Sequence, residues 1–297
     1  MNGFLTEVAK RLAERWAVLL AFPGLLYLAT VAIAYTLGWG HALDMRRLND
    51  QIVRWAQDPT LRSVGGSILI IVATLLGSVA LGLAAATLGR AVSFVWTMPG
   101  QRPPAVWLTR WRRNRSQQAK RDADEPFSNA DQIRAAISRA DRISPFEADR
   151  PTWIGDRLLA SRLRIDRVYG LDLDAIWPRL WLIVPETTRT ELNGARDAYT
   201  ASARLMGWAL LYAVLTFRWW PAAPLALIIS ITAQVRAREA TAMLADLLES
   251  TVDLHARELT TQLGFPDPGG PVTTDEGRTI TFHTRKSRWD PNSPVSE

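Results

Sequence analysis

Two long uncharged apolar runs constrain the fold more than any other feature of this sequence. The first extends from Trp16 to Gly38 and the second from Ser67 to Gly89, and neither contains Asp, Glu, Lys or Arg. At about 1.5 Å per helical residue, each run measures about 35 Å, which exceeds the roughly 30 Å of a bilayer hydrocarbon core. We therefore expect a mainly α, integral membrane protein with two transmembrane helices in this half.

A cleaved signal peptide is the alternative for the first run, because basic residues precede it and Ala32-Ile33-Ala34 resembles a cleavage site. The run continues past these residues through Leu37 and is longer than the apolar core of a typical signal peptide. We therefore favour a transmembrane helix, preceded by an amphipathic surface helix at residues 1–15.

A third apolar region, 199–236, is interrupted by Arg218-Trp219-Trp220-Pro221. Each arm alone is shorter than the roughly 17 to 25 residues of a full span, but flanking arginines that reach the headgroups lengthen both arms. We expect a hairpin of two further transmembrane helices, with a re-entrant hairpin as the alternative. The fold predicted is thus α-helical with four transmembrane helices and a cytoplasmic helical region.

Tryptophan and basic residues predict where the chain meets the membrane surface. Tryptophan is frequent, with 13 copies, and favours the headgroup level. The candidate interface anchors are Trp177, Trp181, Trp219 and Trp220. The segment Arg110–Arg121 carries basic and no acidic side chains, as expected for contact with anionic lipid headgroups. The candidate headgroup contacts are Arg110, Arg112, Arg113, Arg115, Lys120 and Arg121.

The distribution of basic residues also predicts the orientation. Lys and Arg are more frequent in 1–15 and 90–121 than in the connection 39–65, and basic loops stay in the cytoplasm. We expect a multi-pass protein of the cell (plasma) membrane with both termini cytoplasmic. In a soluble protein, the sequence pI of 10.1 would suggest nucleic-acid binding. Here the basic residues flank apolar runs, so lipid is the expected partner and nucleic acid is not.

Small residues on the second run predict close helix packing. Such rows let helix backbones approach each other, either within one chain or between two copies. The candidate packing residues are Ala73, Gly77, Ser78, Gly82 and Ala86. They allow a homo-oligomer as well as packing on another span.

No catalytic, metal or cofactor site is predicted. The chain has no cysteine and only 3 scattered histidines, and it lacks the common nucleotide-binding and hydrolase motifs. Asp172 and Asp174 are the strongest pair of carboxylates, for which ion pairing with nearby arginines is favoured over catalysis. Asp253 and His255 are two residues apart on a predicted helix and point to different faces.

The remaining chain is predicted to be helical around one unusual segment. Residues 169–185 suggest either an extended segment on the membrane face or a buried element of a cytoplasmic domain, and Thr152 is a candidate cap for the helix before it. The expected divisions are 1–15 surface helix, 16–98 first two spans with their loop, 99–198 basic cytoplasmic region, 199–236 hairpin, 237–264 cytoplasmic helix and 265–297 disordered tail.

Three short stretches carry a resemblance. Pro151-Thr152-Trp153-Ile154-Gly155-Asp156-Arg157-Leu158, Tyr169-Gly170-Leu171-Asp172 and Trp177-Pro178-Arg179-Leu180-Trp181 together resemble a pattern of uncharacterised bacterial multi-pass membrane proteins. The resemblance covers residues 151–263 and implies that the central region and the hairpin form one module. It implies no activity.

These features predict a non-enzymatic scaffold or partner-binding membrane component. The expected partners are membrane lipids, further copies of the chain and a cytoplasmic protein that docks on the basic region. An oligomeric pore or channel is the alternative, because Ser230, Thr232 and Gln234 place polar groups near the end of the fourth predicted span.

Overall fold

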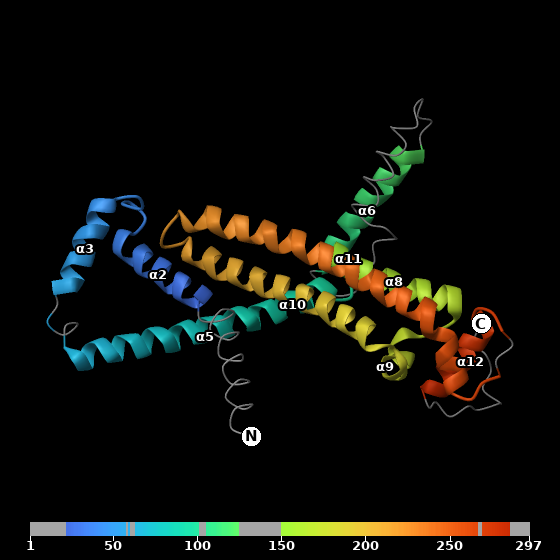
Figure 1. The fold of residues 1–297 in the computed structure, drawn as a ribbon. Coiled ribbons are helices and arrows are strands. Elements are labelled where there is room, and N and C mark those ends of the chain that lie inside the picture. Colours follow the sequence, from blue (N-terminus) through green and yellow to red (C-terminus); the bar gives the residue numbers. More distant parts are fainter. Residues whose placement is uncertain are drawn as a thin grey trace, which may run out of the picture. The chain divides into compact units, whose positions relative to one another are not determined.

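The computed structural model of this 297-residue chain is almost entirely helical (Figure 1). It describes residues 22–57, 59, 63–100, 105–124, 150–266 and 269–285. The structure is 84% helix, and no strand occurs within these ranges, which confirms the mainly α prediction. The predicted surface helix at 1–15 lies outside the described residues.

The chain divides into two compact units, each considered by itself below. Unit 1 comprises Met1–Ser93 and Thr200–Arg236, and unit 2 comprises Phe94–Tyr199 and Ala237–Glu297. Three helices contribute residues to both units: α5 (Val64–Thr97), α10 (Glu186–Leu215) and α11 (Ala222–Gln262).

The described part of unit 1 starts with an apolar helix and an amphipathic one. α2 (Phe22–Leu37) covers the described part of the first apolar run. α3 (Met45–Gln57) follows, and the Asp44 carboxylate accepts hydrogen bonds from two backbone N–H groups in its first turn. The described part of α3 extends to Gln57.

The helical hairpin is also confirmed, with longer arms than predicted. α10 and α11 are joined by a turn in which the N–H groups of Arg218 and Trp219 both donate to the Leu215 carbonyl at 3.0 Å. Pro221 precedes the first residue of α11, where its missing N–H costs no helical hydrogen bond. α11 then continues without a break to Gln262, so the helix predicted at 237–264 extends directly from the hairpin.

Glycine lets the helices of unit 1 approach backbone to backbone. A Cβ added to Gly24 of α2 would lie 2.3 Å from the Ser78 carbonyl oxygen of α5. A Cβ added to Gly207 of α10 would lie 2.2 Å from the Ala85 carbonyl oxygen, also of α5. Any side chain at either position would force the helices apart. Ser78 and Ala85 of α5 therefore pack against other helices of the same chain.

Three aromatic side chains pack together in the interior of unit 1. The Tyr27 ring lies 6.1 Å from that of Trp208 and 5.1 Å from that of Tyr212, the latter in an edge-to-face arrangement. The Tyr27 hydroxyl donates to the Leu211 carbonyl at 3.1 Å. These contacts join α2 to α10 and satisfy the one polar atom that Tyr27 brings into an apolar interior.

The outward faces of unit 1 carry large apolar side chains. On α5 they include Leu69 and Leu76, with exposed fractions of 72% and 66%. α5 has 34 residues and is the one helix among the described residues that is long and apolar enough to cross a membrane; α2 is apolar but shorter. This supports a membrane location by length and composition.

Among its described residues, unit 2 adds four shorter helices to its parts of α5, α10 and α11. They are α6 (Ala105–Asp124), α8 (Trp153–Tyr169), α9 (Leu173–Ile183) and α12 (Thr274–Thr284). The Thr152 hydroxyl accepts a hydrogen bond from the Gly155 N–H at 3.1 Å, which confirms Thr152 as the cap of α8. α8 ends at Gly170, which has a left-handed φ of 66°.

A core formed by α8, α9, α11 and α12 holds unit 2 together. Its fully buried side chains include Ile176, Leu180, Val252 and Ile280. Burying each such aliphatic side chain contributes about 1.5–3 kcal/mol. Unit 2 therefore has an apolar interior of its own.

The extended alternative for residues 169–185 is wrong, because α9 is a helix. Ile176 and Leu180 lie four residues apart and place one apolar face in the core, so the buried-element alternative is confirmed. Pro178 lies inside α9, although a proline usually interrupts a helix. Trp177 packs against the same core, and its ring lies 5.8 Å from that of Trp181.

The prediction of a disordered tail is wrong for residues 269–285. Thr273 and Glu276 form a reciprocal capping box at the start of α12, and Ile280 inserts into the core of unit 2. The Pro, Gly, Ser and Thr content of 265–297 concealed this short helix, because its apolar face has few residues. Residues 286–297 lie outside the described ranges.

Candidate anion-binding site

A cavity of about 490 Å³ in unit 2 is the best candidate for a functional site. Pro99 and Gly100, which follow the end of α5, form one part of its wall. α6 contributes Val106, Thr109, Arg110 and Arg113, and the α8 side contributes Arg150 and Leu159. The described lining thus contains three guanidinium groups and no carboxylate.

A buried ion pair joins the two sides of this cavity. Arg112 Nη1 lies 2.8 Å from Asp156 Oδ2, and both side chains are largely buried, at 11% and 1% exposure. Arg112 Nη1 also donates to the Arg150 carbonyl at 2.6 Å. A buried carboxylate requires such compensation, so Asp156 in the first turn of α8 determines where α6 lies.

Arg150 is held in place by its backbone as well as its side chain. Its N–H donates to Asp156 Oδ1 at 2.7 Å, and its guanidinium donates to the Thr97 carbonyl. Burial lowers the pKa of Arg150, and the nearby Arg162 lowers it further, while Asp156 acts in the opposite direction.

The start of α8 is seated against the end of α5 within unit 2. The Thr152 hydroxyl donates to the Trp96 carbonyl, and a Cβ added to Gly155 would come within 2.6 Å of the same oxygen. The Trp96 ring lies 6.2 Å from that of Tyr199 on α10. These contacts position the wall of the cavity independently of any ligand.

The structure separates the six basic residues that the sequence grouped together. Arg110 and Arg113 line the cavity, Arg112 forms the buried ion pair, and the Arg115 guanidinium lies 5.3 Å from the centre of the Trp111 ring. Lys120 and Arg121 belong to α6, but their side chains lie outside the description. The headgroup contact itself stays a prediction.

Sequence reasoning missed Arg150 and Asp156. Both are far along the chain from α6, and a lone arginine before a helix carries no motif. The available signal was the Thr152 cap, which indicates the start of α8 but not the helix that packs beside it.

The carboxylate pair Asp172 and Asp174 forms ion pairs at the start of α9. Asp174 lies 2.9 Å from Arg162, and Asp172 pairs with Arg285. Burial by itself would raise the pKa of Asp172, but hydrogen bonds from Arg285 and from the Asp174 N–H lower that pKa below its ordinary value. Asp172 thus acts as a helix cap joined to the end of α12.

Asp253 and His255 have separate partners, as their spacing predicted. Asp253 accepts a hydrogen bond from the Tyr169 hydroxyl at 2.8 Å, while His255 lies 3.3 Å from Glu258. No group of three or more His, Asp or Glu side chains in the described part of the chain is arranged to hold a metal ion.

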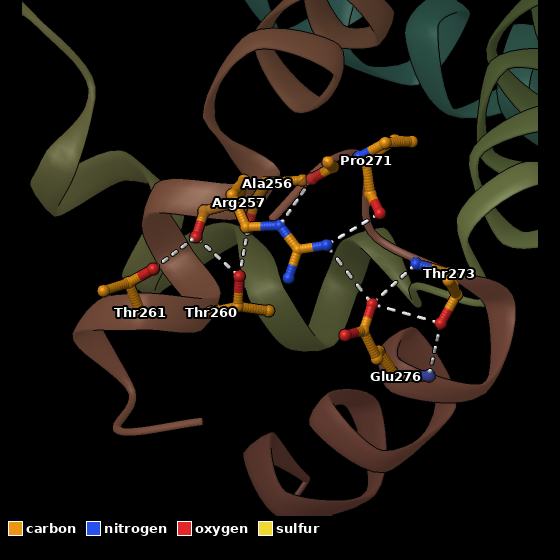
Figure 2. Close-up of polar contacts among 8 residues, drawn as sticks. Ala256, Arg257, Thr260, Thr261, Pro271, Thr273 and Glu276 are labelled. Carbon is orange, nitrogen blue, oxygen red and sulfur yellow. Dashed lines mark hydrogen bonds and ion pairs between the residues drawn. The ribbon is translucent and has the colours of Figure 1, made fainter. Parts of the chain in front are cut away.

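A second polar cluster attaches α12 to α11 (Figure 2). The Arg257 guanidinium donates to the carbonyls of Gly270 and Pro271 at 2.8 and 2.7 Å and to Glu276 at 3.4 Å. Glu276 is also the second member of the capping box with Thr273. We call this cluster the Arg257 clamp. Its contacts attach α12 and the segment before it to α11 and indicate a structural role.

The predicted packing residues of α5 differ in their exposure. Ser78 and Gly82 are buried, Gly77 and Ala86 are half-buried, and Ala73 is exposed. Ser78 and Gly82 therefore belong to the face that packs within unit 1.

The predicted anchors of the hairpin lie at its turn. The Trp219 indole N–H donates to the Ala42 carbonyl at 2.9 Å, and Trp220 is exposed. The Arg218 guanidinium lies 5.7 Å from the centre of the Tyr35 ring. Trp177 and Trp181 belong instead to unit 2. Their role as membrane anchors stays a prediction.

Comparisons with protein-family models, with curated proteins and with solved structures gave no match. The described residues form a mainly α protein with one helix able to cross a membrane and a helical unit that contains a cationic cavity.

Proposed function

We propose that this chain is a multi-pass membrane protein with four transmembrane helices and both termini in the cytoplasm. Unit 2 then acts as a non-enzymatic scaffold that meets anionic lipid and a protein partner. The carrying observation is the exposed apolar surface of unit 1, where large side chains such as Leu69, Leu76 and Ile228 are exposed along its helices. Outward apolar surface of this extent needs a hydrocarbon solvent or a covering partner.

The four spans are α2, α5 and the parts of α10 and α11 that belong to unit 1. Residues 205–217 and 222–235 carry no charged side chain. Their exposed side chains include Leu210, Val214, Ile228 and Ile231. Arg204 and Arg236 stand at the two ends of this apolar region, where long basic side chains reach the headgroups.

A scaffold role agrees with the ion pairs that the carboxylates of unit 2 form. Asp156, Asp172 and Asp174 each pair with an arginine, as structural carboxylates do. The cations of α6 have no matching run of acidic residues within the helix, so they remain suited to anionic surfaces.

The topology can be tested by labelling, because the native chain has no cysteine. Single cysteines at Gln117 and Asp275 are expected to react only with a reagent admitted to the cytoplasm. Cysteines at Gln57 and Phe217 are expected to react with an impermeant reagent outside intact cells. The cysteine-free parent is the control, and labelling of all four positions from one side would contradict the proposal.

The oligomeric pore is the second hypothesis, and ion flux separates the two. Purified protein in sealed liposomes is expected to give no ion or small-dye flux above empty liposomes if the scaffold proposal holds. Flux above that control, lost in Thr232→Val, would support the pore. Thr232 donates its hydroxyl to the Ile228 carbonyl within α11, so its replacement leaves the helix intact.

A further inference from the structure

The cavity beside α6 differs from an ordinary basic surface in its construction. Its three guanidinium groups come from two places far apart in the sequence, Arg110 and Arg113 on α6 and Arg150 before α8. Arg113 and Arg150 are half-buried, whereas a solvated face leaves its arginines exposed. Like charges gathered in a recess repel one another, and a bound anion relieves that repulsion.

Arg150 is held in place by contacts within the chain. The Arg150 guanidinium donates one hydrogen bond to the Thr97 carbonyl. Because a guanidinium has five N–H donors, this bond uses only one of them. The Asp156 carboxylate is engaged by Arg112 and by the Arg150 N–H, so these groups are ordered by contacts within the chain. A site whose side chains are already ordered loses less conformational entropy on binding.

The chemistry of the lining favours a phosphate group. Guanidinium groups bind phosphate oxygens with two parallel hydrogen bonds, and a phosphate monoester presents three terminal oxygens with a charge near −2. The cavity volume of about 490 Å³ lies in the usual range for small-molecule sites and exceeds the needs of a simple ion. Leu159, Val106 and Pro99 supply apolar wall for the remainder of such a ligand.

We propose that this cavity binds a phosphate monoester through Arg110, Arg113 and Arg150. The source is either the headgroup of an anionic phospholipid or a soluble phosphorylated compound. The lipid source rests on the proposed function, because it requires unit 2 to meet the membrane surface. The soluble source does not. Thr109 is a further polar residue of the lining.

The first experiment uses inorganic phosphate as the probe. Full-length protein in nanodiscs of neutral phosphatidylcholine is titrated with inorganic phosphate by calorimetry. We expect Arg113→Gln and Arg110→Gln each to weaken binding by about tenfold, since each removes charge-assisted hydrogen bonds. Arg167→Gln, which removes an exposed cation of α8 outside the cavity, is the matched control and is expected to change binding by less than about twofold.

The second experiment distinguishes the two sources. Nanodiscs containing phosphatidic acid, a monoester, or phosphatidylglycerol, a diester, are compared for lipid that stays bound to the protein in native mass spectrometry. Selective retention of phosphatidic acid that inorganic phosphate displaces identifies the lipid source. Phosphate binding without retained phosphatidic acid identifies the soluble source.

Three outcomes would overturn the proposal. They are the absence of binding in both experiments, retention of phosphatidylglycerol as strong as that of phosphatidic acid when both lipids are retained, and equal losses of phosphate binding in Arg113→Gln and Arg115→Gln, which is the result for a diffuse charged surface. Arg110 is exposed, so Arg110→Gln keeps the test valid if Arg113→Gln fails to fold. The titration requires no particular topology, so a failed labelling experiment would leave it interpretable.

Discussion

Leu76 in unit 1 and Leu254 in unit 2 are similarly exposed, at 66% and 76%, yet they lie in different surroundings. Around Leu76 most neighbouring side chains of α5 are also large, apolar and exposed. Leu254 stands among Asp253, His255 and Arg257 on α11. The contrast teaches that exposure of one leucine means little, whereas a continuous exposed apolar face indicates a different solvent.

The largest expected effect concerns the core of unit 2. Leu180→Ala is expected to destabilise unit 2 by about 2–5 kcal/mol, because it leaves a cavity among fully buried side chains. Leu182→Ala on the same helix is the control, since Leu182 is exposed and its loss is expected to change stability by less than about 0.5 kcal/mol. Chemical unfolding followed by tryptophan fluorescence measures both. Equal effects would show that α9 has no buried face.

A charge placed on each exposed leucine tests the comparison directly. Leu76→Asp is expected to oppose membrane insertion by about 3 kcal/mol, the cost of a carboxylate at the centre of a span. Leu254→Asp is expected to leave insertion unchanged, because an exposed position in water tolerates charge. Carbonate extraction of membranes provides the measurement. Normal insertion of the Leu76 variant would mean that this face of α5 does not meet lipid.

Two glycines of α10 lead to opposite predictions for replacement by alanine. Gly207→Ala is expected to destabilise unit 1 by about 1–3 kcal/mol, because the new Cβ would collide with the Ala85 carbonyl. Gly194→Ala meets nothing within 4 Å and is expected to stabilise the helix by up to about 1 kcal/mol. Thermal unfolding in detergent compares the two variants. A stabilising Gly207→Ala would contradict the close approach of α10 to α5.

The smallest effect concerns pH and the Arg257 clamp. A hydrogen bond from the Thr273 N–H, with further help from Arg257, lowers the pKa of Glu276 below its ordinary value of 4.5. A lowered pKa means that the clamp contributes fully above about pH 4.5 and is lost as the pH falls through the lowered pKa. A spin label at position 278 is therefore expected to become more mobile on acidification. In Glu276→Gln the mobility should not depend on pH in this range.

Local features of the fold were predictable from nearby residues. Thr152 caps α8, and Arg218 lies in the turn of the hairpin. Each depends on residues within one or two helical turns, so a local pattern is sufficient. α12 was missed although Thr273 and Glu276 form a capping box, because the composition around them indicated a loose tail.

By itself the sequence determined the mainly α class, the position of α5 as a helix able to cross a membrane and the basic character of α6. These properties follow from the length, hydropathy and charge of continuous segments. Only the tertiary structure decided that Asp156 orders Arg112 and Arg150, and that α12 completes a core with α9. Such contacts join residues far apart in the chain, and they depend on which helix faces meet, which no single segment encodes.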